Sequence, residues 1–451
     1  MRTKKLSVLG SILVLAGTAS AQAPSGPPLL KPMPAAGAPP VTTAPIVQPQ
    51  ATTITSEPMD SWTSYADSTG ADWNVLRFNA EYLLWWTKKQ QVQAPLVTST
   101  SVVPPDFDTF GGLAVPGTTI LAGAGNLDYG TRSGGRLTAA LAVTDVFDAE
   151  ISAFVLGQRT YKLDFYSDGA GNPPLFRPVV NVEPDPDFAS PNGGNPVSFP
   201  GAYVNGVINI RSSSEFWGGE VNAIAHLVRD PAWKVSALAG FRLLCLDEDL
   251  RINDGGTNSP AADYVFLGDS KGPGYRLETF DSFGALNHFY GGQAGVAAER
   301  QFGRFSIEAK AKLALGATVQ RLNIAGSSGS VAPAVGAING PTEVVHFAGL
   351  LTTPNNIGVH TRSVFAVAPE VNFNVNVDVF SWLRCSVGYT LLYWSNVIRP
   401  GDQVDLLVNQ SGVPSSGAFD PALPGQKYPR VLFNQSDYWA HGLNFSAELR
   451  Y

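Results

Sequence analysis

The chain has 451 residues and a formal net charge of −7 at pH 7, and charged residues make up only 15% of it. This acidic balance argues against a nucleic-acid binder, because phosphate recognition requires a basic surface. The 46 glycines and 34 prolines favour many short strands joined by loops over a helical protein.

The N-terminus has the form of an export signal. Three basic residues precede the apolar run LSVLGSILVLAGTA, and the sequence ASA at positions 19–21 has the small-x-small pattern of a signal-peptidase site. The apolar run is shorter than the roughly 20 residues that a spanning helix needs, so a membrane anchor is the weaker interpretation. We expect residues 1–21 to be a cleaved signal peptide, whose removal changes the formal charge from −7 to −10.

Residues 22–72 are rich in Pro, Ala, Thr and Ser and contain few bulky apolar side chains. A segment of this composition has too little apolar surface to form a packed core. We expect it to be a disordered periplasmic tether that acts as a spacer rather than as a PxxP recognition motif. The predicted folded domain is the remainder of the chain, residues 73–451.

Beyond the tether, ten segments alternate apolar and polar residues with the period of two that is typical of β-strands. In the clearest of them, PEVNFNVNVDVF, one face carries Val and Phe and the other carries Asn and Asp. Each segment has about the 9 to 11 residues that a tilted strand needs to cross a bilayer. The ten segments are 77–88, 136–143, 149–162, 216–228, 233–246, 288–300, 305–316, 369–380, 383–394 and 438–451.

The connections between these segments alternate strictly between short and long. Those after the second, fourth, sixth and eighth segments are only a few residues long, and the other five are much longer. A secreted β-sandwich, the alternative fold, has no reason to place every long loop at one end, whereas an outer-membrane barrel has short periplasmic turns and long external loops. We predict an all-β, antiparallel, up-and-down transmembrane barrel of about ten strands. Residues 115–130 and 201–214 could add a hairpin and raise the number to twelve.

The polar faces of the segments carry charges of both signs at mid-strand. A basic side chain that faces lipid at the bilayer midplane costs about 2 to 4 kcal/mol, whereas charges in the lumen can pair. We therefore expect the apolar rows to face lipid. The predicted lumen-facing residues are Arg77, Glu81, Arg136, Glu150, Glu220, Arg242, Gln293, Glu299, Glu308, Lys310, Lys312, Glu370, Asn372, Asn374, Arg384 and Glu448.

Aromatic residues gather near the ends of the segments, where the interfacial girdles of a barrel lie. The ordinary preference of Trp and Tyr for strands is an equally good explanation. The last segment ends on an aromatic residue at the chain terminus, a pattern that resembles the signal read by the barrel-assembly machinery. Lipid and this machinery are therefore the expected partners. Near segment ends lie Trp85 and Trp394 and the predicted interfacial residues Trp73, Trp86, Trp233, Trp382, Trp439 and Tyr451.

Several stretches are similar to those of a known family. They are RFNAEYLLWWTKKQQVQAPLVTST at 77–100, SGGRLTAAL at 133–141, GFRLLCLDEDL at 240–250, NHFYGGQAG at 287–295 and the aromatic final strand. Together they resemble the seventh family of putative beta-barrel porins, which is known chiefly from planctomycete genomes. The resemblance covers about residues 73–451. It implies an outer-membrane β-barrel of porin type and carries over no catalytic residue.

Residues with catalytic or metal-binding chemistry are scarce. No cluster of Cys or carboxylate residues with ligand spacing surrounds His346 and His360, the two histidines expected in a long loop. We expect no enzymatic activity, no cofactor and no metal site. Cys245 and Cys385 are the only cysteines and lie in different strand segments, so we expect two unpaired thiols rather than a disulfide.

Two functions remain open. The first is a porin with a narrow, polar, net-acidic passage for small solutes or ions. Ten strands make such a passage narrow at best, because side chains already fill the interior of an eight-stranded barrel. The second is a non-conducting structural or adhesive barrel that displays long external loops. Whether the lumen is plugged decides between them.

Overall fold

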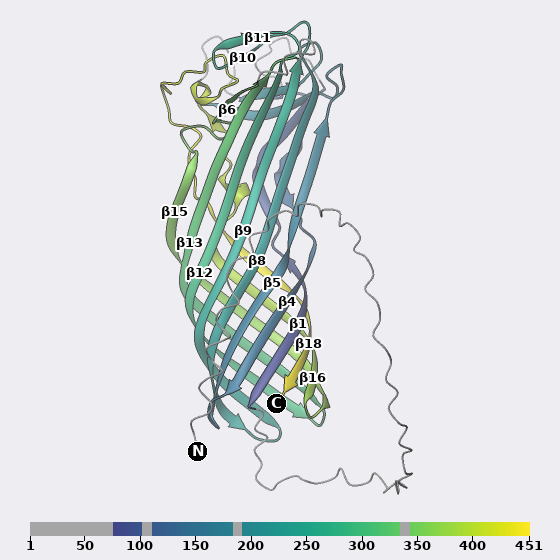
Figure 1. Cartoon of the computed structure of the whole chain (residues 1–451), viewed down its shortest axis with the longest axis vertical. Coiled ribbons are helices and arrows are strands. Elements are labelled where there is room, and N and C mark those ends of the chain that lie inside the picture. Colours follow the sequence, from purple (N-terminus) through teal and green to yellow (C-terminus); the bar gives the residue numbers. More distant parts are fainter. Residues whose placement is uncertain (1–74, 102–110, 184–191, 334–342) are drawn as a thin grey trace, which may run out of the picture. The chain divides into compact units, whose positions relative to one another are not determined.

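The structure is a computed structural model that describes residues 75–101, 111–183, 192–333 and 343–451 (Figure 1). The expected signal peptide, the expected tether and Trp73 lie outside the described residues. Among the described residues, no helix combines the length and the apolar character needed to cross a membrane.

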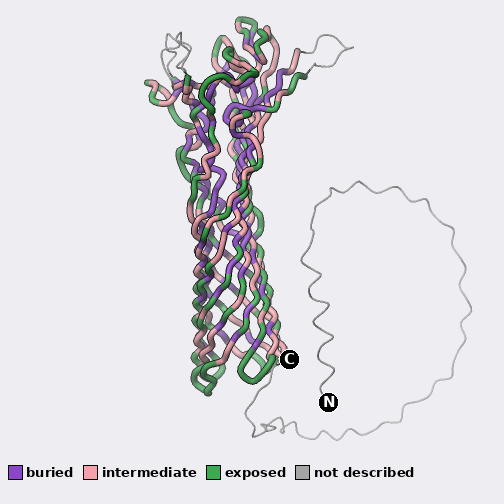
Figure 2. The backbone as a smooth tube through the Cα atoms, turned by 90° about the vertical axis from the view of Figure 1, so that its left-hand side faces the viewer, coloured by how far each residue is buried: buried purple, intermediate pink, exposed green. Residues whose placement is uncertain are grey.

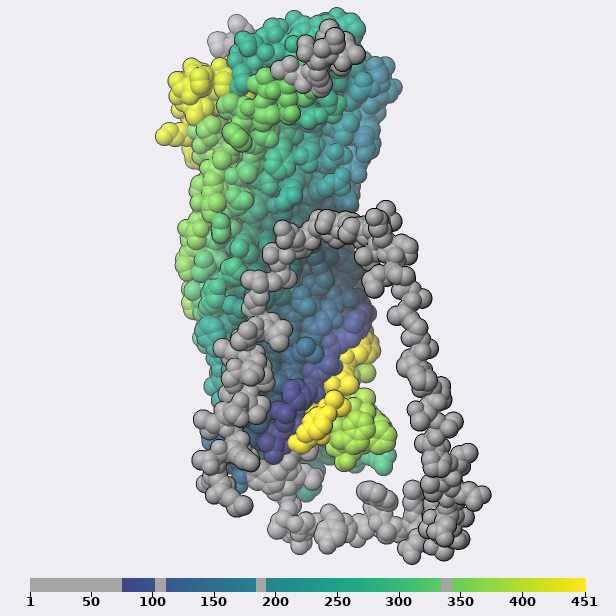
Figure 3. Space-filling view, viewed as in Figure 1, coloured from purple at the N-terminus to yellow at the C-terminus, as the bar shows by residue number. Residues whose placement is uncertain are grey.

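Ten antiparallel strands close on themselves to form a barrel. In the wall they follow the order β12-β9-β8-β5-β4-β1-β18-β16-β15-β13, and β13 pairs again with β12. The first and last strands, purple and yellow in Figure 3, lie side by side. The predicted fold class and strand number are therefore confirmed. The wall strands are β1 (Leu76–Thr87), β4 (Thr131–Ala142), β5 (Phe147–Tyr166), β8 (Tyr203–Arg229), β9 (Trp233–Asn258), β12 (Arg276–Phe302), β13 (Phe305–Val331), β15 (Gly358–Phe380), β16 (Leu383–Ile398) and β18 (Gln435–Arg450).

The long connections gather at one end of the barrel and contain small sheets of their own (Figure 1). Residues 115–130 contribute a loop strand that pairs outside the wall, and residues 201–214 lengthen β8, so neither adds an eleventh or twelfth wall strand. The elements in the long connections are β2 (Gln90–Thr100), β3 (Thr118–Leu127), β6 (Leu175–Asn181), β7 (Asn192–Ser198), β10 (Tyr264–Phe266), β11 (Asp269–Lys271), β14 (Glu343–His346), β17 (Leu407–Val408), η2 (Pro400–Gln403) and η3 (Gln410–Gly412).

Each wall strand alternates between buried and exposed residues, as the purple and green stretches of Figure 2 show. In β15, Val371 is 50% exposed and Phe373 is 49% exposed, whereas Asn372 between them is only 7% exposed. A soluble sandwich would bury the apolar row and expose the asparagines. The opposite arrangement is that of a membrane barrel, whose apolar row meets lipid.

Several strands are much longer than a bilayer requires, and their outward rows change from apolar to polar part-way along. On β8 the outward residues are apolar from Leu227 up to Trp217, and polar from Glu215 to Asn209. β9 changes at the matching place, because Trp217 pairs with Cys245 and Glu215 pairs with Asp247. At about 3.3 Å per residue and a tilt of about 40°, the apolar part of β8 spans about 25 Å, the height of a barrel's lipid-facing band. The barrel therefore extends well beyond the membrane on the side of the long loops.

Aromatic residues on outward positions lie at both edges of this apolar band. At the edge with the short turns, Trp233, Trp382 and Tyr451 are exposed by 42%, 53% and 69%. At the other edge, Trp86 and Trp439 both contact the ring of His441, at centroid distances of 5.9 and 5.1 Å.

Trp85 and Trp394, which also lie near segment ends, are not interfacial but buried inside the barrel. Both belong to inward-facing rows, and each buried indole N–H has a hydrogen-bond acceptor, as large polar-tipped rings require. Trp85 donates to Asn444 Oδ1 at 2.7 Å, and Trp394 donates to Thr318 Oγ1 at 2.9 Å.

The two cysteines are free, as expected. Cys245 lies on β9 and Cys385 on β16, and these strands are not neighbours in the wall.

Candidate functional site in the barrel interior

The half of the interior nearest the short turns is polar. It holds a cavity of about 70 Å³ lined mainly by Asn, Ser and Glu side chains. Asn374 donates to Glu308 at 3.1 Å, and Arg384 pairs with both Glu299 and Asp378, at 2.8 and 2.7 Å. The wall asparagines therefore serve as hydrogen-bonding groups in an enclosed polar space.

Above this cavity, six charged side chains form a network across the barrel, which we call the ionic layer; its members are Glu81, Arg136, Glu220, Arg242, Lys312 and Glu370. Arg242 lies 2.5 Å from Glu220 and 2.8 Å from Glu370. Lys312 bridges the same two carboxylates, at 2.8 and 3.0 Å. Arg136 lies 3.6 Å from Glu81 and 4.0 Å from Glu370. Three cations and three carboxylates thus balance one another in a largely buried place, where an unpaired charge would be costly.

An apolar layer lies directly against the ionic layer. Phe216 is central to it, with ring centroids 5.0 Å from Tyr438 and 6.5 Å from Trp394. The guanidinium of Arg136 lies 5.5 Å from the ring of Trp85, so the two layers touch. The large buried members of the apolar layer are Leu83, Trp85, Leu156, Phe216, Leu244, Leu246, Phe289, Leu392, Trp394, Val397 and Tyr438.

The apolar layer corrects the expectation of a lumen that is polar throughout. The physical reason is visible in β1, where Leu83 and Trp85 follow Glu81 on the same inward row. The run YLLWW is apolar on both faces, so one of its faces must fill the interior. Assigning alternate residues of this run to opposite faces of a strand would have predicted the apolar layer.

The connections at the membrane-distal end fold back into the barrel mouth and form a plug. Side chains of β2, β6 and β7, such as Val92, Val179 and Val197, pack with inward residues of the wall such as Ile208 and Ile252. The side-chain amide of Asn287 on β12 bonds both the carbonyl oxygen and the N–H of Ile398, each at 2.8 Å.

Two buried arginines fasten the plug to the wall. Arg399, at the start of the last long connection, makes a two-pronged contact with Glu248 on β9, at 2.8 and 2.6 Å. Arg177 on β6 contacts Asp254 on β9 at 2.6 Å and Asp281 on β12 at 3.0 Å. Paired planar contacts of this kind fix geometry as well as charge. We call these contacts the loop locks.

Very little free space remains where the ionic and apolar layers meet. The cavity between Arg136, Glu220, Arg242, Phe154 and Leu244 has a volume of only about 10 Å³. A single water molecule needs about 10 to 15 Å³ measured in this way. The side chains of the two layers therefore leave almost no room between them at this place.

The sequence from residue 78 to residue 451 matches the model of the family described as "Putative beta barrel porin-7 (BBP7)". The chain belongs to this family. The family and the closed barrel together place this BBP7 protein in the outer membrane, as the resemblance implied. The comparison with curated proteins finds no match.

Solved structures similar to this BBP7 barrel are distant. The outer membrane protease OmpT from Escherichia coli aligns with a TM-score of 0.38 and 8% identity, over 83% of this chain and 96% of that chain. The TodX deltaS2S3 mutant monoaromatic hydrocarbon channel gives 0.22 and 9%, over 83% and 90%. A Pseudomonas aeruginosa FadL homologue gives 0.18 and 10%, over 83% and 89%. TM-scores this low carry no argument about what the BBP7 protein does.

The structure places the residues selected from the sequence on inward-facing rows of the BBP7 barrel, and several form pairs outside the ionic layer. Arg77 pairs with Asp148, and Glu448 pairs with Arg450 at 2.7 Å. Gln293 donates to Asn222 at 2.5 Å, which in turn donates to Glu150 at 3.1 Å. The remaining selected residues, Glu299, Glu308, Lys310, Asn372, Asn374 and Arg384, also lie on inward rows of their strands.

Sequence reasoning missed the loop locks. Glu248 shares the inward row of β9 with Arg242, so its position could have been found by counting residues in the segment GFRLLCLDEDL. Arg177 and Arg399 lie in connections without strand periodicity, and no signal in the sequence points to them.

Two groups near the contact between Arg399 and Glu248 have pKa values shifted from their ordinary values. Burial alone would lower the pKa of Arg399, but the carboxylate of Glu248 raises it above its ordinary value. Burial raises the pKa of Asp402, in the neighbouring η2, to about 6, although Arg399 acts in the opposite direction. Asp402 is thus a plug residue that changes charge in a mildly acidic medium.

The five histidines of the BBP7 barrel lie on five different strands, β8, β12, β14, β15 and β18. Within the described ranges, no three His, Cys, Asp or Glu side chains are placed to hold a metal ion. His226 faces inward and contacts Asp148 at 3.1 Å and Ser236 at 3.0 Å. His346 lies on β14, within a long connection as expected, whereas His360 lies on the wall strand β15 and not in a loop.

Proposed function

We propose that this BBP7 protein is a closed outer-membrane barrel that holds a folded platform of loops at the cell surface, without catalytic activity. The observation that carries the proposal is the narrow junction between the ionic and apolar layers, where about 10 Å³ is free. The plug and its two loop locks support it further, because they fill part of the barrel mouth with packed and paired side chains. The barrel's extension beyond the apolar band lifts the platform away from the lipid.

A planar-bilayer recording tests this proposal. The full mature chain is refolded in detergent, and its insertion is checked by the change in gel mobility on heating. We expect no conductance steps from inserted protein at moderate voltage. Regular steps from the unmodified chain would overturn the closed state.

The narrow, polar, net-acidic passage is the second candidate, and a specific observation favours it. The polar cavity near the short turns is lined by Glu81, Glu308 and Glu448 but by only one cation, Arg384. If the layers above it move apart, this cavity becomes the entrance of a passage that prefers cations.

Replacing residues 400–434 by a short Gly-Ser linker tests the second candidate. This deletion removes most of the last long connection but leaves every wall strand in place. Conductance steps with a cation-selective reversal potential in a KCl gradient would favour a gated passage. A variant that folds and stays silent would favour the closed platform.

A further inference from the structure

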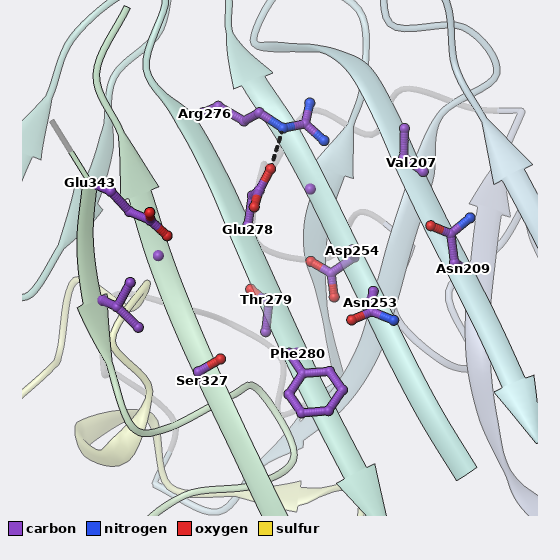
Figure 4. Close-up of a pocket in the computed structure, with 13 residues that line it drawn as sticks. Val207, Asn209, Asn253, Asp254, Arg276, Glu278, Thr279, Phe280, Ser327 and Glu343 are labelled. Carbon is purple, nitrogen blue, oxygen red and sulfur yellow. Dashed lines mark hydrogen bonds and ion pairs between the residues drawn. The ribbon is translucent and has the colours of Figure 1, made fainter. Parts of the chain in front are cut away.

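A groove of about 250 Å³ lies on the outer wall of the barrel's extension, above the apolar band. Five strands contribute to it: β8, β9, β12, β13 and β14. Figure 4 shows the lining side chains, with Asn209 and Asn253 close together, the ring of Phe280 below them, and Arg276 at the opposite end. The plug and the ionic layer face the other side of the wall, and Asp254, one of the lining residues, also contacts Arg177 of the plug.

The strand register builds the floor of this groove. Asn209, Asn253, Phe280 and Ser327 pair successively across four strands and form one outward row. In the adjacent row, Glu278 stands between two glycines, Gly255 and Gly329. Glycines within strands often mark a place where another group approaches the backbone closely.

Charged groups overhang both glycines. A Cβ atom on Gly255 would lie 2.8 Å from Nη2 of Arg276, and one on Gly329 would lie 3.7 Å from Oε1 of Glu343. The guanidinium of Arg276 is also held by Glu278, at 2.8 Å from Nε to Oε1. The groove thus has a charged upper rim with donors and acceptors, and a lower edge with amides and an aromatic ring.

We propose that this groove binds a saccharide. Sugar hydroxyls both donate and accept hydrogen bonds. Amides do both, carboxylates accept and a guanidinium donates, and this groove has all three side by side. The Phe280 ring offers an apolar surface to the C–H face of a sugar ring. The volume lies below the range of about 300 to 1,000 Å³ typical of drug-sized ligands, which suits one or two sugar rings.

Other ligand classes fit the groove less well. A phosphate or other anion would meet three acidic lining residues, Asp254, Glu278 and Glu343, against one guanidinium, that of Arg276. A purely apolar ligand would leave the amides and charged groups without partners, which is costly.

The position of the groove also suits a saccharide. Asp247 lies at the polar edge of the apolar band, and Asn253 lies six residues farther along β9, which places Asn253 about 15 Å above the lipid. Both a free polysaccharide and the sugar headgroup of a glycolipid reach this height.

Binding measurements on the refolded full chain test the proposal. The probes are maltotriose, the trisaccharide of N-acetylglucosamine, and nanodiscs of phosphatidylethanolamine with or without lipopolysaccharide. The test variants are Asn253→Ala and Phe280→Ala. Their matched controls, Asn323→Ala and Phe365→Ala, change outward residues on β13 and β15 that do not line the groove.

We expect saturable binding of at least one sugar-bearing probe, weakened about tenfold or more by each test variant and less than twofold by each control. Binding of a trisaccharide identifies a free saccharide as the ligand, and binding of lipopolysaccharide nanodiscs alone identifies a glycolipid headgroup. Absence of saturable binding to every probe by the folded wild-type chain would overturn the proposal. Equal weakening by test and control variants would overturn it as well.

Discussion

Arg242 and Glu370 meet at 2.8 Å inside the barrel, although β12 and β13 separate their strands in the wall. A contact of this kind is possible only across the interior, so the ionic layer ties distant parts of the wall together. The layer is balanced in charge. Each buried carboxylate or cation has lost its contact with water, and its oppositely charged partners compensate for this loss. The layer is built from pairs on neighbouring strands, such as Glu220 with Arg242, and contacts across the interior join these pairs into one network.

Arg242→Met should lower the free energy of unfolding by about 3 to 5 kcal/mol, because it leaves the buried carboxylates of Glu220 and Glu370 with Lys312 as their only shared cation. Urea unfolding in lipid vesicles, followed by Trp fluorescence, measures the change. The double variant Arg242→Met with Glu370→Gln restores the charge balance and should be less destabilised than the single variant. Additive losses from the two substitutions would contradict a shared network.

The wall of the barrel could be predicted from the sequence because lipid imposes a strict rule on one row of every strand. Within the apolar band, the outward row of β15, with Val371, Phe373 and Val375, obeys this rule without interruption. The alternation of short and long connections then predicted the up-and-down topology, because all short turns lie on one side of the membrane and all long loops on the other.

The interior was harder to predict because its residues follow a different rule. Inward residues need only satisfy one another, so polar and apolar layers can succeed each other along one strand, as Glu81, Leu83 and Trp85 do. Counting inward positions finds such residues. The partners that come from irregular connections, such as Arg177 and Arg399, cannot be found in this way, because their positions depend on how the loops fold into the mouth.

Val371→Arg tests the orientation of the wall. Val371 lies on the outward row near the middle of the apolar band, and a lipid-facing Arg there should cost about 2 to 4 kcal/mol. Thr361→Arg, on the same outward row of β15 but beyond the apolar band, should cost less than about 1 kcal/mol. Unfolding free energies in vesicles of matched thickness measure both. Equal costs at the two positions would argue against the placement of the band.

Phe216→Ala tests the apolar layer. The Phe216 ring is fully buried among Tyr438 and Trp394, so its removal should cost about 3 to 5 kcal/mol and leave a cavity. Phe305→Ala, at an exposed position on the rim, is the matched control and should cost far less. In bilayer recordings, we expect brief conductance steps from Phe216→Ala and none from Phe305→Ala. A silent but destabilised Phe216→Ala would mean that the ionic layer alone closes the barrel.

Asp402→Asn tests whether the plug responds to pH. The pKa of Asp402 is about 6 in the folded protein, against about 3.9 in an unfolded chain. The folded state therefore holds this proton more tightly, and plug stability should fall as the pH rises from about 4 to about 6. We expect the fall to be about 1 to 3 kcal/mol, because a shift of about two pKa units corresponds at most to about 3 kcal/mol. Cleavage of the loops by an external protease at pH 4.5 and 7.5 measures this difference, since cleavage follows the population of opened loops.

Asp402→Asn should remove the added sensitivity to the protease at pH 7.5, whereas the exposed loop variant Asp269→Asn should keep it. A wild-type plug that is equally resistant at both pH values, once the intrinsic rate of the protease is corrected for, would contradict this role of Asp402.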